Sequence, residues 1–158
     1  MIRAWRISSV KFAGNAFDGE GPRVNGGRWN SPGVRVSYSA ESLSLATLEV
    51  LVRLLSQAIL KDYTVLTIDF PLETAMEVDV TTLPANWRAS PPPETLQAIG
   101  NAWVESGRSL ILRVPSAVIP VDHNYLINPS HPDFARVVIG NPTPLDIDPR
   151  VLRPLGAS

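Results

Sequence analysis

Alternation between apolar and polar residues predicts β-strands at several places along the chain. Residues 34–39 alternate strictly, as expected for a half-buried strand. Residues 63–70 have an apolar centre and are followed by Pro71, which ends a strand. Residues 2–7 alternate only weakly, which suggests an edge strand. Shorter apolar runs predict three further strands, at 77–80, 110–114 and 136–139.

Apolar residues three or four positions apart predict two helices. The first follows the strand at 34–39, with Ser39 as its cap and Glu41 in its first turn, and runs to about residue 60. The second covers residues 94–105, after a rigid run of three prolines. Helices and strands mix without a repeat or a linker, which indicates a single α+β domain over residues 1–158. The apolar face of the first helix would carry Leu48, Leu51, Val52, Leu55 and Ile59.

The long glycine-rich segment at residues 8–33 is a candidate functional loop, since long loops in compact domains are usually functional or disordered. It ends in Gly26-Gly27-Arg28-Trp29-Asn30. A glycine pair lets a ligand approach the backbone, and an arginine can fork two donors onto an anion. Tyr38 then supplies an aromatic ring, and Glu49 is a lone acid in an apolar helical segment. The set suits a phosphorylated substrate that carries a ring.

Composition narrows the choice of function. The 158 residues include 14 basic and 15 acidic ones, so the formal net charge is −1 and no basic field would recruit nucleic acid or an anionic membrane. Cysteine is absent and histidine occurs only twice, so we expect neither a thiol nucleophile nor a bound metal. Without a long apolar run or a leader pattern, the expected location is the cytoplasm.

Each candidate residue also has an ordinary structural interpretation. Glu49 lies four positions before Arg53, the favourable order for an ion pair on a helix surface. Arg28 could satisfy loop carbonyls, and Tyr38 could be a core aromatic with a tethered hydroxyl. Ser116 follows a proline, where a serine commonly forms a turn.

Several motifs recur in one order: Arg3-Ala-Trp-Arg6, Gly26-Gly27-Arg28-Trp29-Asn30, Val36-Ser-Tyr38-Ser-Ala40, Leu48-Glu49-Val50, Val114-Pro-Ser116 and Asn124-Tyr-Leu-Ile-Asn128-Pro-Ser-His131-Pro. Over nearly its whole length the chain thereby resembles the RES-domain family. These are toxins of bacterial toxin–antitoxin pairs, named for an arginine, a glutamate and a serine.

The resemblance implies a fold similar to ADP-ribosyltransferase toxins, with a split, twisted β core, flanking helices and an NAD⁺ cleft. It also implies cleavage of NAD⁺ at the nicotinamide–ribose bond and a cognate antitoxin of the helix-turn-helix, Xre-like kind. A homodimer is compatible with a small domain this rich in apolar residues. The implied catalytic residues are Arg28, Tyr38, Glu49 and Ser116, and the implied NAD⁺ contacts are Arg28, Tyr38, Gly27, Asn30 and Ser39.

The chemistry of NAD⁺ cleavage suits these residue types. Nicotinamide departs from a ribose that becomes an oxocarbenium-like cation, and the Glu49 carboxylate can stabilise that cation. Arg28 stays protonated and therefore serves as an anion clamp for the pyrophosphate or as a positioning donor. The Tyr38 ring can face the nicotinamide. Ser116 can bind a carboxamide or ribose hydroxyl or steady Glu49, although Ser109 and Ser130 are nearby alternatives.

Two questions stay open at this level. Hydrolysis of NAD⁺ and transfer of ADP-ribose to a protein begin with the same cleavage, so the residues do not separate them. A non-catalytic partner-binding module is a further alternative. Its contacts would come from exposed tryptophans and from arginines near both ends of the chain, namely Trp5, Trp87, Arg3, Arg6, Arg150 and Arg153.

Overall fold

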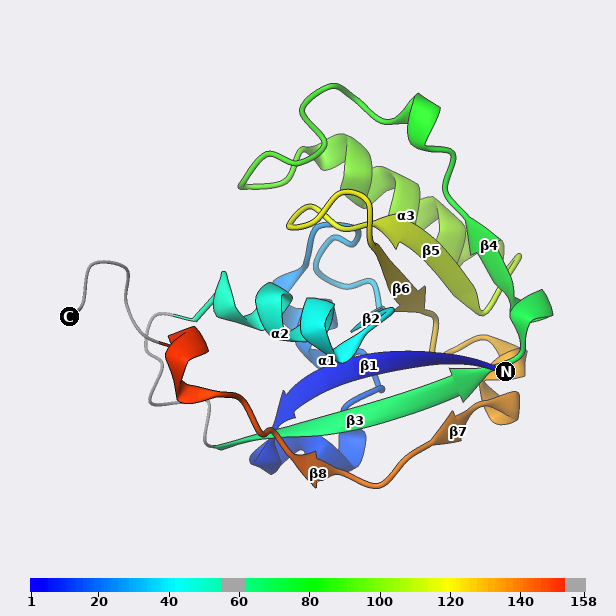
Figure 1. Cartoon of the computed structure of the whole chain (residues 1–158). Helices are drawn as coiled ribbons and strands as arrows, with labels where there is room; N and C mark the ends of the chain where they lie inside the picture. Colours follow the sequence, from blue (N-terminus) through cyan, green and yellow to red (C-terminus); the bar gives the residue numbers. More distant parts are fainter. Residues whose placement is uncertain (55–61, 153–158) are drawn as a thin grey trace.

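The computed structural model describes residues 1–54 and 62–152 of the chain. Its strands form one sheet in the order β4-β5-β6-β2-β1-β3-β7, and β8 also pairs with β3 (Figure 1). Neighbouring strands run antiparallel, except that β4 and β5 are parallel. The strands are β1 (Ile2–Ser9), β2 (Ser37–Ala40), β3 (Tyr63–Phe70), β4 (Ala75–Glu77), β5 (Ile111–Pro115), β6 (His123–Ile127), β7 (Val138–Ile139) and β8 (Thr143–Pro144).

The sheet is split in its middle. Strands β1 and β3 pair along their whole length, whereas β1 and β2 share only the pair Trp5–Ala40. One half therefore contains β4, β5, β6 and β2, and the other contains β1, β3, β7 and β8. Helices flank this sheet, so the predicted α+β fold with a split, twisted β core and flanking helices is confirmed (Figure 1).

The strand predictions are confirmed in part, because the alternating run at 34–39 forms β2 only from Ser37 and the strand predicted at 77–80 lies earlier, at Ala75–Glu77. Strand β3 has the predicted bounds, Tyr63–Phe70. The edge position predicted for β1 is wrong, because β1 lies between β2 and β3. Its weak alternation reflects burial on both faces, with Ala4, Ile7 and Ser8 all buried. Strand β6 was not predicted, since its three buried residues are consecutive and alternation is absent.

The helices are α1 (Glu20–Asn25), α2 (Leu43–Leu51) and α3 (Glu94–Ser106). Helix α3 matches its prediction within one residue. Helix α2 begins later than predicted, because its cap is Ser42, whose side chain accepts from the backbone N–H of Leu45 at 3.1 Å. Ser39 instead lies in β2. Helix α2 also ends earlier than predicted, at Leu51 instead of near residue 60. The predicted apolar positions Leu55 and Ile59 lie outside the described residues.

The predicted apolar face of α2 is wrong. Leu48 and Val52 are exposed, and the buried positions are Leu45, Ala46 and Val50. Six of the nine positions of α2 are apolar and they occur all around the helix, so spacing alone could not select the buried face.

The segment at residues 8–33 is more regular than a long loop. It contains a 3-10 helix at Val10–Asn15 and then α1. Further 3-10 turns occur at Leu72–Thr74, Val80–Thr82, Pro132–Arg136 and Pro149–Leu152.

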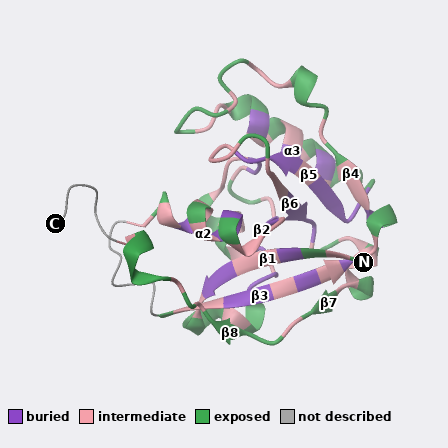
Figure 2. Ribbon diagram, in the orientation of Figure 1, coloured by how far each residue is buried: buried purple, intermediate pink, exposed green. Residues whose placement is uncertain are grey.

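Helices α2 and α3 pack on different parts of the sheet. Leu45, Ala46 and Val50 of α2 pack with Ile7 of β1 and Ala40 of β2, so α2 covers the joint between the two halves. Helix α3 packs on the other half, where its buried residues join those of β5, β6 and the loop at residues 26–31, which we call the glycine loop (Figure 2). Glu49 is therefore carried to the split by the packing of α2.

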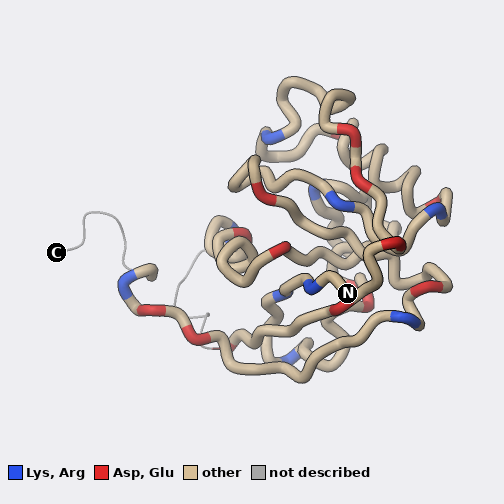
Figure 3. The backbone as a smooth tube through the Cα atoms, turned by 45° about the vertical axis from the view of Figure 1, so that its right-hand side comes forward, with Lys and Arg blue, Asp and Glu red and all other residues tan. Residues whose placement is uncertain are grey.

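Along the described part of the chain, charged residues of both signs are interspersed (Figure 3). None of the described helices is both long and apolar enough to cross a membrane.

Candidate functional site

The Glu49 carboxylate receives hydrogen bonds from two separate strands of the sheet. Ser116, directly after β5, donates from Oγ to Glu49 Oε1 at 2.7 Å. Asn124, in β6, donates from Nδ2 to the same oxygen at 2.8 Å. Glu49 is half-buried, so these two charge-assisted bonds hold the acid in a defined orientation. We call Glu49, Ser116 and Asn124 the acid cluster.

The position of Ser116 is itself fixed by a turn. Its side-chain oxygen accepts from the backbone N–H groups of Val118 at 3.0 Å and Ile119 at 3.1 Å. Its own N–H donates to the Asp122 carbonyl at 2.9 Å. With those lone pairs occupied, the hydroxyl proton of this fully buried serine is directed to Glu49. Ser116 therefore forms a turn and also holds the acid.

The two alternative serines have other environments. Ser109 Oγ accepts from Trp103 Nε1 at 2.8 Å and donates to the Ile111 carbonyl at 2.8 Å. Ser130 is exposed on a loop after β6. The structure thus brings Ser116, and neither alternative, into contact with Glu49.

The prediction of a surface ion pair between Glu49 and Arg53 is wrong. Arg53 Nε donates at 3.2 Å to the backbone carbonyl of Glu49, and its guanidinium makes no ion pair with the carboxylate within residues 1–54 and 62–152. The carboxylate turns instead toward the strands, because Ser116 and Asn124 offer donors there.

Gly27 and Asn30 of the glycine loop form a tight unit with Tyr38 of β2. Tyr38 donates from its hydroxyl to Asn30 Oδ1 at 2.6 Å and accepts from the Trp29 N–H at 3.1 Å. A Cβ at position 27 would lie 2.7 Å from the Tyr38 hydroxyl oxygen, so glycine is needed for this approach. Asn30 is fully buried, and its Nδ2 donates to the Pro22 carbonyl at 2.8 Å. Asn30 thus acts by organising the loop.

The interpretation of Tyr38 as a tethered aromatic agrees with these contacts. The residue is half-buried and packs against the core beneath α3. Burial raises the pKa of Tyr38 well above its usual range, against the lowering influence of the Trp29 N–H and of Arg28 and Arg53. The phenol is therefore neutral at physiological pH.

Arg28 contacts loop carbonyls and also lies within the electrostatic reach of the acid. Its Nη1 donates to the carbonyls of Trp87 and Ala89, each at 2.9 Å. Burial lowers the pKa of Arg28, while the charges of Glu49 and Tyr38 act to raise it. A guanidinium carries five N–H donors, so these two bonds leave donors for a ligand.

Helix α3 supports the glycine loop in a way that the sequence did not reveal. Gln97 donates from Nε2 to the Gly27 carbonyl at 3.1 Å, and Asn101 Oδ1 accepts from the Ser31 N–H at 3.0 Å. Between them, a Cβ at Gly100 would lie only 1.6 Å from the Trp29 carbonyl oxygen. The signal for this contact in the sequence was a glycine, Gly100, between two amide residues, Gln97 and Asn101, on one face of a helix.

Arg6 is a second residue at the split whose role the sequence left undefined. Its Nη1 donates to the Tyr38 carbonyl at 2.8 Å, across the opening between β1 and β2. Its Nε is buried without a hydrogen-bond partner in the described part of the chain. Burial lowers the pKa of Arg6 to about 10, with Arg53 acting in the same direction and Asp18 opposing it. This guanidinium remains charged at neutral pH.

Ser39 is separated from these contacts, because its Oγ is buried and donates to the Tyr125 carbonyl at 3.0 Å.

The surface expected for a binding module is also less available than predicted. Trp5 and Trp87 are half-buried rather than exposed. Arg3 is held by Asp69 in a 2.8 Å ion pair.

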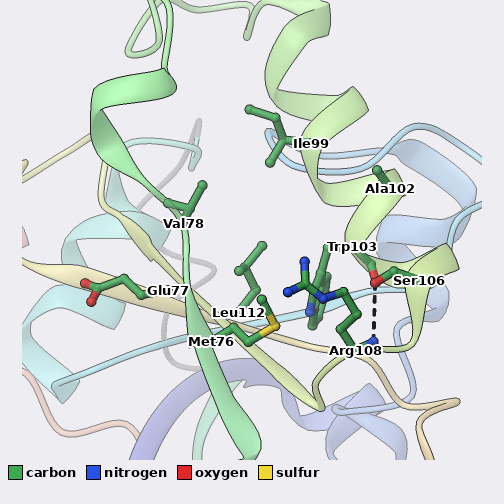
Figure 4. A pocket seen from close by; sticks show the side chains of 9 residues that line it. All are labelled: Met76, Glu77, Val78, Ile99, Ala102, Trp103, Ser106, Arg108 and Leu112. Carbon is green, nitrogen blue, oxygen red and sulfur yellow. Dashed lines mark hydrogen bonds between the residues drawn. The ribbon is translucent and has the colours of Figure 1, made fainter.

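A separate apolar pocket of about 370 Å³ lies between α3 and strands β4 and β5 (Figure 4). It shares no residue with the acid cluster or the glycine loop. The lining residues are Met76, Glu77, Val78, Ile99, Ala102, Trp103, Ser106, Arg108 and Leu112. The candidate functional site is therefore defined by the polar contacts around Glu49 and not by this pocket.

Known proteins resemble this chain over most of its length. Residues 3–148 match the RES domain family. A protein named Toxin Res from Photorhabdus laumondii is 37% identical over 85% of this chain and 86% of its own length. A Sphingobium protein named Prs ADP-ribosylating toxin is 36% identical over 94% of this chain and 96% of its own. In fold, the chain resembles the crystal structure of the M. tuberculosis MbcT–MbcA toxin–antitoxin complex, with a TM-score of 0.75, 20% identity, and coverage of 90% of this chain and 83% of the matched one.

Proposed function

The chain belongs to the RES-domain family of toxin–antitoxin toxins, and we propose that its acid cluster cleaves NAD⁺ at the nicotinamide–ribose bond. The observation that supports this proposal is the oriented Glu49 carboxylate at the joint of the split sheet, with two donors on one of its oxygens. Arg28 and Arg6, two guanidinium groups near the same split, suit a substrate with a diphosphate.

The reaction follows from the charges of the site and of NAD⁺. The bond between C1′ of the ribose and the ring nitrogen breaks, and its electron pair neutralises the pyridinium, so nicotinamide leaves without an acid. Positive charge develops on the ribose, where the Glu49 carboxylate stabilises it. In hydrolysis, water then forms a bond to C1′ and releases its proton to solvent, which gives ADP-ribose.

Transfer of ADP-ribose to a protein is the second candidate, and one observation favours it. The Sphingobium relative, 36% identical over 94% of this chain, is named a Prs ADP-ribosylating toxin. In that reaction a nucleophilic side chain of the acceptor replaces water at C1′. Both candidates require the same carboxylate and the same departure of nicotinamide.

We further propose that the activity is neutralised by a partner antitoxin of the helix-turn-helix, Xre-like kind. The support is the similarity in fold to a toxin that was crystallised with its antitoxin. If a small helix-turn-helix protein is encoded by a neighbouring gene, its co-expression with this chain would test the pairing, with growth and co-purification as the readouts. Growth arrest that persists under co-expression would contradict it.

Purified protein incubated with NAD⁺ provides the main test. We expect release of nicotinamide, measured by chromatography, and the fate of ADP-ribose separates the two candidates. Free ADP-ribose indicates hydrolysis, whereas a labelled protein band that appears only with cell lysate indicates transfer. A non-catalytic binding module releases no nicotinamide at any protein concentration.

Expression in bacteria tests the consequence for the cell. If the chain degrades NAD⁺, induction without its antitoxin should lower cellular NAD⁺ as growth stops. Normal NAD⁺ during a clear arrest would contradict depletion and favour modification of a protein.

A further inference from the structure

Both hydrogen bonds to the Glu49 carboxylate reach the same oxygen. Ser116 and Asn124 donate to Oε1 at 2.7 and 2.8 Å. Within the residues that the structure describes, Oε2 accepts no hydrogen bond and forms no ion pair. The terminal torsion of a glutamate is broad when nothing restrains it. Two donors on one oxygen fix this torsion and so decide which oxygen is free.

Asn124 is well placed to act as such a restraint. Strand β6 is paired on both sides, with Asn124 opposite Ala40 of β2 and opposite Val114 of β5. Its backbone is therefore held by two neighbouring strands, and its planar amide has few torsions through which to move.

The two donors also belong to one rigid unit. Ser116 and Asn124 stand on the hairpin formed by β5 and β6, in which Pro115 pairs with His123. The Ser116 N–H closes the hairpin by donating to the Asp122 carbonyl at 2.9 Å. Glu49 comes from a different element, α2, so the hairpin orients an acid that the helix delivers.

We infer that Asn124 is a positioning residue for the proposed cleavage of NAD⁺: it holds Glu49 Oε1 and thereby presents Oε2 to the ribose. The inference rests on the proposed function. Asn124 acts through Glu49 and makes no contact with the substrate in this role. Ser116 shares the task, which explains why a buried serine whose lone pairs already serve a turn still donates to the acid.

The first test compares Asn124→Ala with Asn128→Ala. Asn128 is a matched control, because it is a buried asparagine directly after the same strand, and among the described residues its Oδ1 accepts only from the nearby Ser130 N–H at 3.0 Å. For Asn124→Ala we expect kcat for nicotinamide release to fall about 10–100-fold, since small displacements of a reacting group have effects of that size. The KM for NAD⁺ should stay within about twofold, because no substrate contact is lost. Asn128→Ala should keep the parental kcat even if it unfolds at a lower temperature.

The second test uses a readout that a merely structural residue would not change. Asn124→Asp places a second carboxyl group against Glu49 Oε1. Two carboxylates at such a short distance share one proton at low pH. The shared proton can replace the lost N–H donor. We therefore expect the rate of Asn124→Asp to fall as pH rises and the proton is lost, with no such alkaline decline in the parent or in Asn128→Ala.

The outcomes separate this inference from the function on which it rests. A parent that releases nicotinamide together with an Asn124→Ala protein of unchanged kcat would overturn the positioning role alone. The same holds if Asn128→Ala loses as much kcat, or if Asn124→Asp keeps the parental pH profile. A parent that releases no nicotinamide would overturn the proposed function and the positioning role with it.

Discussion

Ser116 Oγ lies 2.7 Å from Glu49 Oε1, although 67 positions separate the two residues in the chain. The serine belongs to one half of the split sheet, and the glutamate belongs to a helix that packs across the joint. The orientation of the acid therefore depends on the docking of α2 onto both halves. A change that loosens this docking should lower activity before it unfolds the protein.

Glu49→Gln tests the central residue. The variant keeps the side-chain volume but removes the charge that would face the oxocarbenium ion. We expect nicotinamide release to fall on the order of 10²–10³-fold, the usual cost of losing one such electrostatic contact. Glu105→Gln, on the exposed surface of α3, is the matched control and should behave as the parent. Near-parental turnover by a folded Glu49→Gln protein would show that Glu49 is not the catalytic acid.

Arg28→Lys tests the anion clamp. Lysine retains the charge but loses the planar fork, and it has too few donors to serve both loop carbonyls and a diphosphate. We expect NAD⁺ to bind about tenfold or more weakly, since a hydrogen bond to a charged group contributes about 1.5–3 kcal/mol. Calorimetry in the Glu49→Gln background measures this affinity without turnover. Arg88→Lys, at an exposed arginine bonded to Ala117, serves as the control. Equal affinity in both variants would leave Arg28 as a loop support only.

Gly100→Ala tests the support that α3 gives to the glycine loop. Alanine in a helix interior normally gains about 1 kcal/mol over glycine. Here the new Cβ would lie 1.6 Å from the Trp29 carbonyl oxygen, so the helix and the loop must separate. We expect the free energy of unfolding to fall by about 1–3 kcal/mol, with weaker NAD⁺ binding. Gly21→Ala, with no atom within 4 Å of its Cβ, should show no such loss. Chemical denaturation of both variants measures this difference in the free energy of unfolding.

Tyr38→Phe tests the buried phenol through pH. The pKa of Tyr38 is raised in the folded protein, so the folded state keeps a proton that the unfolded chain loses above about pH 10. The stability that the phenol contributes is thus fully present below about pH 10 and is lost as pH rises beyond it. We expect the difference in unfolding free energy between the parent and Tyr38→Phe to shrink above that pH. A difference that is constant from about pH 8 to about pH 11 would contradict the burial of this hydroxyl.

Much of the site could be named from the sequence because its residues sit in local signals. The glycine pair, Arg28 and Asn30 are adjacent, and Glu49 stands out as an acid in an apolar helix. Strand β3 was marked by an apolar centre ended by Pro71 and helix α3 by its apolar spacing, and both formed as predicted. In each case the information lies within a few neighbouring residues. Local periodicity and a local change of polarity are what a sequence expresses directly.

Only the tertiary structure decided how these pieces meet. It placed β1 inside the sheet, selected the buried face of α2, and brought Asn124 onto the oxygen that Ser116 also holds. Each of these depends on strand order or on contacts between distant segments. An asparagine in an unpredicted strand, buried on both faces, has no periodicity to mark it. The position of this asparagine is set by burial and by hydrogen bonds between distant segments. The free energy of a buried polar group depends on the partner that it bonds and not on its neighbours in the chain.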